Sequence, residues 1–505
     1  MFQHELIAGI DIGTSRCRGM IWNMNGEKVY EVHHAYPTHV SKEGWHEHDP
    51  ELVKQAFLDT LQNIICFVSS LRRNNTLIIT LSSYLNSVIP VDKHGKPLSN
   101  CLIWTDRRAA DIVKEEKQKI NIGDLYKRTG CPLHPMYPIW KIVWFRINEP
   151  NIYSKVEKWI SIKEYIIHKL WGEYLVDWSV ASSTGLFNIH NCEWDATALE
   201  IAELQASYLS TPVSPLTQLP PLPREHAKTA SNCQIHFVIG GGDGPLSCIG
   251  SGAVVDGVAD NTVGSGGAIR CVSFEPLLDR ERRTFCYVLM PNMWVVGGVT
   301  PGGVVLDWFI DALCESSKTY VDWEKSLVYQ TIEHEAAQVP PGSDNLIFLP
   351  FVTGAYCPSW NPNTCGVFWG IKPHHTKKHL IRAVIEGLAY ERYRAMKAVE
   401  SVIGSIRAAY LSGGLARSTL WGEIITNVLG IEHRVPSVIE TSALGAAFLG
   451  GLSYGLFTNF EQINVLNPII KTLKPQLDIS HIYQNTIDVY CSLLNSCFQK
   501  GGENG

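Results

Sequence analysis

A short apolar run that ends in a turn of glycine and hydroxyl residues occurs twice in this chain of 505 residues, about 250 residues apart. The first copy spans Leu6 to Ser15 and the second spans Val258 to Gly266. An apolar run broken by glycine and small hydroxyl residues indicates a strand that enters a tight turn. The duplication therefore predicts two related lobes, each opening on the same strand and turn.

The residues around the first copy predict how the lobe continues. The segment 20–33 is typical of a hairpin, with Asn25-Gly26 as its turn. Asp49-Pro50-Glu51 predicts a helix start, because Asp caps helices, Pro suits the first turn and Glu favours the positive end. A buried strand is expected over 77–81. Further along, apolar residues at helical spacing predict a long helix over about 376–401.

The composition excludes several classes of protein. With 45% hydrophobic and 18% charged residues, the chain is neither disordered, collagen-like nor a coiled coil. The 43 basic and 49 acidic residues leave a net charge of -6, which disfavours nucleic acid as a partner. No apolar stretch approaches 18 residues, and the run Leu6–Ile10 is too short for a signal peptide. The expected location is therefore the cytoplasm, without a membrane partner, and a homodimer is one alternative for the oligomeric state.

Two further features bear on organisation and compartment. The proline-rich segment 210–224 is interpreted as an extended surface loop within the first lobe, with an interdomain linker as the alternative. The 14 cysteines contain no C-x-x-C pair. We expect buried, reduced thiols, including four that stand in apolar runs, namely Cys66, Cys248, Cys314 and Cys491.

Glycine and hydroxyl turns follow three short apolar strands. They are Gly13-Thr14-Ser15, Gly264-Ser265-Gly266 and Ser412-Gly413-Gly414. Exposed N–H groups and hydroxyls in such turns can cradle phosphate oxygens, although a single turn of this kind is more often only a turn. The chain has no G-x-x-x-x-G-K-[ST], no D-F-G and no G-x-G-x-x-G after a strand. P-loop enzymes, protein kinases and dinucleotide enzymes are therefore disfavoured.

Two carboxylates stand at strand ends beside glycines. Asp11 lies within Gly9-Ile10-Asp11-Ile12-Gly13, and Asp243 follows the triple glycine 240–242. A carboxylate in this position can hold Mg²⁺ or accept a proton from an attacking hydroxyl, whereas the alternative is an Asp that only stabilises its turn. The histidines show no metal-ligand spacing. The segment Trp104-Thr105-Asp106-Arg107-Arg108 fits either a surface loop or the wall of a polar substrate site.

Together these segments resemble the FGGY family of carbohydrate kinases, in order, from about residue 6 to 455. The segments that carry the resemblance are Asp11-Ile12-Gly13-Thr14-Ser15, Gly44-Trp45-His46-Glu47-His48-Asp49-Pro50, Trp104-Thr105-Asp106-Arg107-Arg108-Ala109, Gly240-Gly241-Gly242-Asp243-Gly244, Asn261-Thr262-Val263-Gly264-Ser265-Gly266, Asn345-Leu346-Ile347-Phe348-Leu349-Pro350-Phe351, Leu411-Ser412-Gly413-Gly414-Leu415-Ala416-Arg417-Ser418 and Glu440-Thr441-Ser442-Ala443-Leu444-Gly445-Ala446-Ala447.

The resemblance implies an α/β fold of two actin-like (ribonuclease H-like) ATPase lobes around a central cleft. Residues 1–255 would form the lobe that binds the sugar and carries the catalytic Asp, and residues 256–505 the lobe that binds nucleotide. ATP and Mg²⁺ are the implied cofactors. The resemblance makes Asp243 the catalytic base and assigns the metal to Asp11 and Asp243. The implied nucleotide contacts are Thr14, Ser15, Arg18, Gly264, Ser265, Gly266, Gly303, Asp307, Gly414 and Ser418. The implied substrate contacts are Leu85, Asn86, Trp104, Asp106 and Asp243.

Segments 129–138, 159–165 and 177–188 are similar to gluconokinases of that family, so gluconate is the implied substrate and 6-phosphogluconate the product. Three positions depart from the gluconokinase pattern. Leu85-Asn86 replaces Met-His, Thr105-Asp106-Arg107 replaces Ala-Asp-Asn, and Gly354-Ala355-Tyr356-Cys357-Pro358 lacks the charges of Gly-Glu-Arg-x-Pro. Asn cannot become cationic as His can, while Arg107 adds a charge that favours an acid. A kinase of xylulose or a polyol and a non-catalytic sugar or nucleotide sensor remain alternatives.

Overall fold

The computed structural model describes residues 5–41, 43–71, 75–223, 233–264, 266–313 and 322–498. Packing groups the chain into two compact units. Unit 1 consists of Met1–Asp256, Val272–Val296 and Glu440–Pro468, and unit 2 of Gly257–Cys271, Gly297–Ile439 and Ile469–Gly505. Each unit is therefore assembled from three separate stretches, whereas the family resemblance implies a single division between residues 255 and 256.

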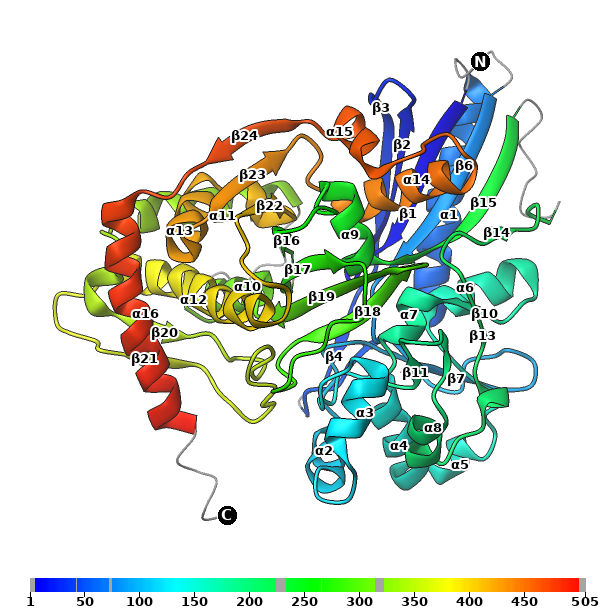
Figure 1. Ribbon diagram of the computed structural model, residues 1–505, viewed down its shortest axis with the longest axis horizontal. Helices are drawn as coiled ribbons and strands as arrows, with labels where there is room; N and C mark the ends of the chain where they lie inside the picture. The colour runs from blue at the N-terminus through cyan, green and yellow to red at the C-terminus, as the bar shows by residue number, and fades with distance from the viewer. Residues whose placement is uncertain are drawn as a thin grey trace. The chain divides into compact units, whose positions relative to one another are not determined.

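Unit 1 is centred on a sheet that has six strands within the described residues, in the order β14-β15-β6-β1-β2-β3 (Figure 1). Strands β1, β2 and β3 form an antiparallel meander, whereas β6 runs parallel to both β1 and β15. The strands of this sheet are β1 (Glu5–Ile12), β2 (Arg16–Asn23), β3 (Lys28–Ala35), β6 (Asn75–Ser83), β14 (Gln218–Leu219) and β15 (Cys233–Gly242).

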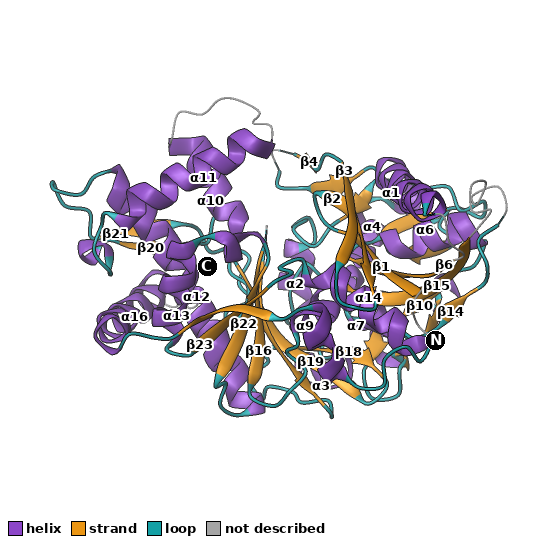
Figure 2. Ribbon diagram, turned by 90° about the horizontal axis from the view of Figure 1, so that it is seen from above, coloured by secondary structure: helices purple, strands orange, loops and turns teal. Residues whose placement is uncertain are grey.

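Successive residues of β1 point to opposite faces of this sheet, and helices cover both faces. Ala8, Ile10 and Ile12 join the apolar core that includes α1 (Pro50–Ser70) and α6 (Ile162–Trp171). Figure 2 shows α1 and α6 together beside the strands. Gly9 faces the other side, where a β-carbon would lie 1.8 Å from the carbonyl oxygen of Ala443. Helix α14 (Thr441–Ser453) thus packs directly on β1, which explains why Glu440–Pro468 belongs to unit 1.

Helix α9 (Asp243–Ser251) follows β15 and packs closely against α14. Glycines permit this approach on both sides. A β-carbon on Gly250 would lie 1.9 Å from the carbonyl oxygen of Thr441, and one on Gly445 would lie 1.9 Å from that of Leu246. The contact fixes the start of α9 relative to the sheet.

Smaller elements complete unit 1. The paired strands are β4 (His39–Val40), β5 (His46–His48) and β8 (Cys101–Leu102); β7 (Ile89–Val91) with β9 (Lys158–Ile160); β10 (Leu175–Asp177) with β13 (Thr211–Val213); and β11 (Phe187–Asn188) with β12 (Glu193–Trp194). The helices are α2 (Ala110–Glu116), α3 (Ile122–Thr129), α4 (Pro138–Asn148), α5 (Pro150–Tyr153), α7 (Trp178–Ser182), α8 (Ala196–Ala202) and α15 (Ile463–Leu466), with 3-10 turns η1 (Ala206–Tyr208) and η4 (Phe460–Gln462).

The second large sheet has seven strands within the described residues, in the order β18-β19-β17-β16-β22-β23-β24. Strand β16 pairs antiparallel with β17 and parallel with β22, as β1 pairs with β2 and β6. The predicted repeat is therefore present as a repeat of topology. The strands are β16 (Val258–Val263), β17 (Gly267–Ser273), β18 (Phe285–Met290), β19 (Met293–Thr300), β22 (Ala408–Ser412), β23 (Glu432–Pro436) and β24 (Ile469–Leu473).

Helices of unit 2 pack on one another and on its strands. Helix α12 lies against α13 and α11, and α16 contacts α13. The remaining elements are α10 (Gly303–Leu313), α11 (Asp322–Ala337), α12 (Lys377–Ile403), α13 (Thr419–Leu429) and α16 (Leu477–Phe498), strands β20 (Ile347–Leu349) and β21 (Val367–Trp369), and 3-10 turns η2 (Ser343–Asn345) and η3 (Gly414–Arg417).

Several local predictions are confirmed. The hairpin β2–β3 turns at Asn25-Gly26, and α1 begins with Asp49 accepting a hydrogen bond from the backbone N–H of Glu51. The expected long helix is α12. The described part of the proline-rich segment, 210–223, is extended within unit 1 and carries β13 and β14.

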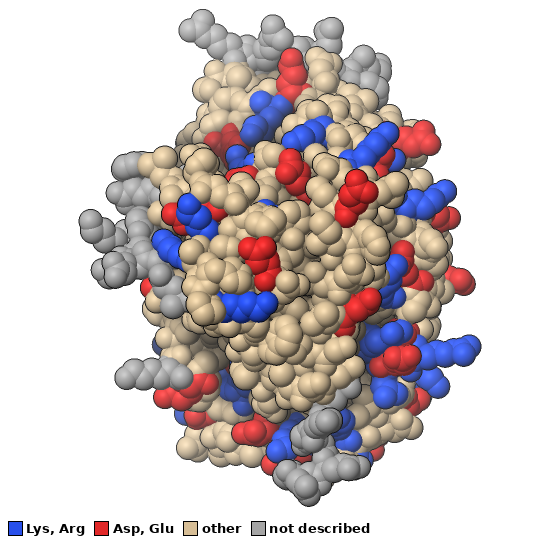
Figure 3. Space-filling model, turned by 90° about the vertical axis from the view of Figure 1, so that its left-hand side faces the viewer, with Lys and Arg blue, Asp and Glu red and all other residues tan. Residues whose placement is uncertain are grey.

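The expectation that the cysteines are buried holds only in part. Cys248 is buried, Cys491 is half-buried and Cys66 is exposed, because Cys66 lies on the outer face of α1. Cys314 lies outside the described residues. Among the helices that the structure describes, none combines the length and apolarity that a membrane crossing requires. On the face seen in Figure 3, positive and negative side chains are interspersed.

Candidate functional site

The carboxyl ends of three parallel strands meet at one edge of the unit 1 sheet. Asp11 of β1 lies opposite Ser82 of β6, and Ser83 lies opposite Gly242 of β15. The Ser82 hydroxyl donates to Oδ1 of Asp11 at 2.6 Å. Burial raises the pKa of Asp11, while this hydrogen bond and the nearby Arg18 guanidinium act in the opposite direction. The edge therefore presents a half-buried carboxylate.

The turn between β1 and β2 carries the residues expected at the first phosphate loop. Its ends are joined by a hydrogen bond of 3.0 Å from the Gly13 N–H to the Arg16 carbonyl. Thr14 is half-buried and Ser15 is exposed. Arg18 lies opposite Asp11 on β2, and its guanidinium forms an ion pair with Glu440, the residue before α14. The pairing of β1 with β2 thus brings a cation beside Asp11.

Asp243 is the first residue of α9 and directly follows β15. Its Oδ1 accepts the N–H of Gly244 at 2.7 Å, and its carbonyl accepts the hydroxyl of Ser442 at 3.0 Å. Gly240 has a φ of +67°, and a β-carbon there would lie 1.9 Å from the Leu81 carbonyl oxygen. This glycine lets β15 bend at the point where it delivers Asp243 to the sheet edge.

Buried contacts hold the loop after β6, which carries the expected substrate residues Leu85 and Asn86. A β-carbon on Gly242 would lie 2.2 Å from Leu85, so the leucine packs directly on the residue before Asp243. Asn86 is only 5% exposed, and its amide donates to the Ser183 carbonyl at 2.7 Å. The ammonium of Lys141, in α4, donates to the carbonyls of Asn86 at 2.9 Å and Ile103 at 2.7 Å. Burial lowers the pKa of Lys141 to about 7.

Asp106 is buried and uses its carboxylate within the protein. It accepts the N–H of His46 at 2.8 Å and a pair of bonds from Arg108, each at 2.9 Å. The Arg108 guanidinium also stacks over the Trp45 ring at 4.3 Å. Asp106 therefore orders the loop that follows the half-buried Trp104.

Arg107 has a different environment from its neighbour. It is half-buried beside His46 and His134, and the part of the chain that the structure describes gives it no carboxylate partner. Burial, reinforced by Arg107 and Lys141, lowers the pKa of His134 to about 3. Both histidines are therefore neutral at pH 7, and the nearby Asp106 carboxylate is paired with Arg108, while Arg107 adds its own positive charge.

The turn between β16 and β17 is the corresponding feature of unit 2. The Gly264 N–H donates to the Gly266 carbonyl at 2.9 Å, and the Gly303 N–H donates to the Gly264 carbonyl at 2.9 Å. These bonds bring the turn to the start of α10. Ser265, which we expect to contact nucleotide, lies outside the described residues.

The other expected nucleotide residues lie on separate elements of unit 2. A β-carbon on Gly414 would meet nothing within 4 Å, so this glycine borders open space. Ser418 caps α13 by accepting the Trp421 N–H at 3.0 Å. Asp307, in α10, accepts the Tyr329 hydroxyl at 2.6 Å.

Comparison with known proteins connects these features. The model of the FGGY family of carbohydrate kinases, N-terminal domain, matches residues 6–250, and that of the C-terminal domain matches 259–454. This chain belongs to the FGGY family of carbohydrate kinases. It is a phosphotransferase with an alcohol group as acceptor, and a small-molecule sugar is its substrate.

Individual relatives of this FGGY kinase cover nearly its whole length. The gluconokinase of Bacillus subtilis (strain 168) is 34% identical over 96% of this chain and 94% of its own. The gluconate kinase of Lactobacillus acidophilus has a TM-score of 0.87 at 29% identity and covers 98% of both chains. The xylulose kinase of the same organism gives the same score and identity over 97% and 98%. The expected actin-like α/β fold is confirmed.

Sequence reasoning missed several buried residues of this FGGY kinase. Lys163 and Lys141 stand inside helical apolar patterns, where a single lysine gives no local signal. Arg392, in the middle of α12, donates to the Thr262 carbonyl at 3.2 Å, directly before the β16–β17 turn. Burial lowers its pKa to about 9.

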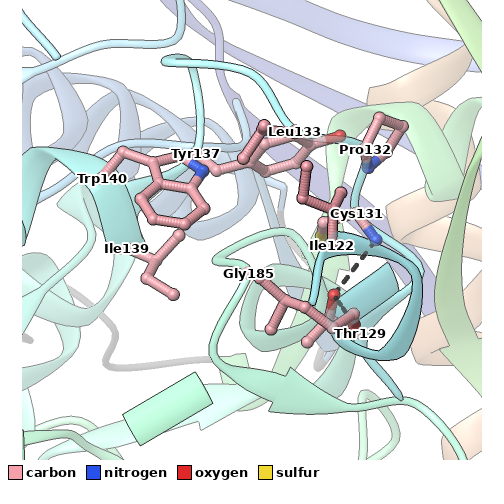
Figure 4. Close-up of a pocket in the computed structure, with 10 residues that line it drawn as sticks. Ile122, Thr129, Cys131, Pro132, Leu133, Tyr137, Ile139, Trp140 and Gly185 are labelled. Carbon is pink, nitrogen blue, oxygen red and sulfur yellow. Dashed lines mark hydrogen bonds between the residues drawn. The ribbon is translucent and has the colours of Figure 1, made fainter. Parts of the chain in front are cut away.

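The segment 129–138, one of the gluconokinase-like segments, lines a small apolar pocket (Figure 4). The Cys131 N–H donates to the Thr129 hydroxyl at 3.3 Å within it. Tyr137 and Trp140 are fully buried in its wall. This segment of the FGGY kinase therefore shapes the core of unit 1.

Proposed function

We propose that this FGGY kinase transfers the γ-phosphoryl group of ATP to the terminal hydroxyl of gluconate, giving 6-phosphogluconate and ADP. The observation that carries the proposal is the placement of Asp243 and Asp11 at the same carboxyl edge of the unit 1 sheet, on strands that flank β6. The Asp243 carboxylate accepts the proton of the hydroxyl as the new oxygen–phosphorus bond forms. The bond between the γ-phosphorus and the bridging oxygen of ADP breaks in the same transfer.

Asp11 has the chemistry of a Mg²⁺ ligand. Mg²⁺ prefers carboxylate and water oxygens, and Asp11 is half-buried and oriented by the Ser82 hydroxyl at 2.6 Å. Asp243 supplies a second carboxylate at the same edge. Bound Mg²⁺ would neutralise phosphate charge and favour the ionised form of Asp11, against the effect of burial.

The loops of unit 2 fit a nucleotide because they offer backbone N–H groups and free space. Gly264 and Gly414 both stand where a β-carbon would meet no atom closer than 4.0 Å. Buried Arg392 holds the carbonyl of Thr262 and adds positive charge near the turn. With a net charge of -6, the protein attracts ATP through such local groups and not through bulk charge. We therefore assign ATP to unit 2 and the acceptor to unit 1.

Gluconate is preferred over a neutral sugar because of Arg107. A half-buried arginine near two neutral histidines, with no acidic partner among the described residues, is suited to a carboxylate ligand. Asp106 does not serve as the acidic partner of Arg107, because its oxygens already accept hydrogen bonds from Arg108 and from the His46 N–H. The similarity to gluconokinases supports the same acceptor.

The test is a panel of acceptors with purified protein and Mg-ATP, measured by ADP release and by identification of the product. The panel contains gluconate, other aldonates, xylulose, glycerol and other polyols. The proposal predicts the highest kcat/KM for gluconate. Preference for xylulose or a polyol by tenfold or more would contradict the assigned acceptor, and tight ligand binding without turnover of any acceptor would instead support a sensor.

A further inference from the structure

The peptide unit that joins Gly241 to Gly242 lies just beyond an irregularity in the pairing of β15 with β6, where Gly241 and Gly242 pair with Ser82 and Ser83. The pairing of β15 with β6 shifts register between Val238 and Gly241, and Gly240 has a φ of +67°. Such an irregularity re-aims the strand locally. Just beyond it, side chains hold the Gly241–Gly242 peptide, which precedes the peptide bond to Asp243.

Two side chains hold this peptide at its two polar atoms. The hydroxyl oxygen of Ser179, in α7, accepts the Gly242 N–H at 2.6 Å. The ammonium of Lys163, in α6, donates to the Gly241 carbonyl at 3.3 Å. A β-carbon on Gly241 would lie 2.9 Å from the Ser179 oxygen, so the glycine is what permits this approach.

Asp177 connects the two holding groups. Its Oδ1 accepts the Ser179 hydroxyl at 2.6 Å, and its Oδ2 accepts the Lys163 ammonium at 2.8 Å. The side chains of Lys163 and Asp177 are each 1% exposed. Asp177 also accepts the N–H groups of Ser179 and Val180 at 3.0 Å, which fixes it as the cap of α7. The network is therefore rigid and fully enclosed.

We propose that Lys163, Asp177 and Ser179 are positioning residues that set the direction of the Asp243 carboxylate by clamping the Gly241–Gly242 peptide. The inference rests on the proposed role of Asp243 as base. A buried ion pair contributes little net stability, because desolvation offsets its attraction. Its geometric effect is larger: a misplacement of about 1 Å at a reacting group costs on the order of 100-fold in rate.

Ser179→Ala is the main test variant, since it removes the acceptor of the Gly242 N–H and leaves the ion pair in place. Its matched control is Ser182→Ala, on the same helix. Ser182 is equally buried and also donates one hydrogen bond, to the Ser179 carbonyl, and accepts one backbone N–H, that of Val288. Both variants lose two bonds, but only Ser179→Ala frees the peptide before Asp243.

We expect Ser179→Ala to lower kcat by about 10- to 100-fold while the KM values for gluconate and ATP change less than threefold. Ser182→Ala should keep kcat within about threefold at a similar melting temperature. Equal kcat in the two variants would overturn the proposal. So would a loss in Ser179→Ala that appears only as a higher KM for ATP.

A second readout separates positioning from general stability. In an Asp243→Asn background, Ser179→Ala should lower the residual rate by less than twofold, because the group that it misdirects is already absent. Full multiplication of the two losses would contradict the clamp. The wild-type protein is the reference: no turnover with any acceptor defeats the proposed function itself, whereas normal turnover of Ser179→Ala defeats only this inference.

The double variant Lys163→Met/Asp177→Asn tests the other half of the clamp without leaving an unpaired buried charge. The asparagine introduced in place of Asp177 can still cap α7, because its side-chain oxygen accepts hydrogen bonds as a carboxylate does. We expect a fold-loss in kcat comparable to that of Ser179→Ala. A folded double variant with wild-type kcat would remove Lys163 and Asp177 from the proposal.

Discussion

The Ser82 hydroxyl donates to the Asp11 carboxylate at 2.6 Å, across the pair of parallel strands that forms the centre of unit 1. In unit 2 the equivalent strand pair carries Thr262 opposite Ser412, and both hydroxyls donate to the buried carboxylate of Asp260. The same topology therefore places a carboxylate near the strand end in unit 1, and two residues further back and paired with Arg270 in unit 2. This difference matches the proposed division of labour, with metal and base chemistry in unit 1.

Arg107→Gln tests the choice of an acidic acceptor. Loss of a charge-assisted hydrogen bond costs about 1.5–3 kcal/mol, so kcat/KM for gluconate should fall about 10- to 100-fold. The kcat/KM for a neutral acceptor such as xylulose should change less than threefold. Exposed Arg280→Gln is the control. Equal losses for acidic and neutral acceptors would contradict a carboxylate site at Arg107.

Gly250→Ala tests the packing of α9 on α14. A β-carbon there would lie 1.9 Å from the backbone oxygen of Thr441, so the helices must separate. We expect a loss of about 1–3 kcal/mol in the free energy of unfolding, measured by urea denaturation. Gly123→Ala is the control, because its β-carbon has no neighbour closer than 3.5 Å. It should be neutral or stabilising by up to about 1 kcal/mol. Equal stability of both variants would refute the close packing.

Gly414→Ala tests the nucleotide loop of unit 2 without disturbing the fold. The new methyl group enters open space, so the melting temperature should not change. If ATP occupies that space, the KM for ATP should rise several-fold, with an unchanged KM for gluconate. Gly413→Ala should behave differently, because its φ of +81° and its approach of 2.6 Å to the Val263 oxygen strain the backbone. An unchanged KM for ATP in Gly414→Ala would place the nucleotide elsewhere.

The burial of His433 leads us to expect that the folded protein loses stability in acid. Burial, with a contribution from Arg392, lowers the pKa of His433 to about 4, below its ordinary value of 6.5. The unfolded chain therefore binds a proton before the folded protein does, and the stabilising contribution, complete above pH 6.5, is lost as the pH falls towards 4. His433→Asn should lower stability at pH 8. The difference from wild type should shrink by up to about 1.4 kcal/mol per pH unit in this window; parallel curves from pH 8 to pH 4 would contradict the assignment.

The fold and the two carboxylates could be predicted because their signals are local. Asp11 lies near the end of an apolar strand and Asp243 directly follows one, and both stand near glycines, so their place at a sheet edge follows from a few neighbouring residues. The prediction for Cys66 was wrong for the opposite reason. Its position on α1 depends on which face packs on the sheet, and a surrounding apolar run does not specify that face.

The clamp on Asp243 could not be predicted from the sequence. Lys163 contacts Gly241, 78 residues later in the chain, and Ser179 contacts Gly242, 63 residues later. Such contacts depend on how α6 and α7 pack beside β15. The substrate loops show the same limit: the sequence predicts a substrate contact at Asp106, but it does not predict the hydrogen bonds that Arg108 and His46 donate to its oxygens.

The most direct test of the account is the steady-state rate of Asp243→Asn with gluconate and Mg-ATP. Asn has nearly the same shape but cannot accept the hydroxyl proton, and general base catalysis contributes about 10²- to 10⁴-fold. We predict a kcat lowered by at least about 100-fold, with ATP affinity, measured by calorimetry, within threefold of wild type. A variant that keeps a near-normal kcat would contradict the assignment of Asp243 as the base.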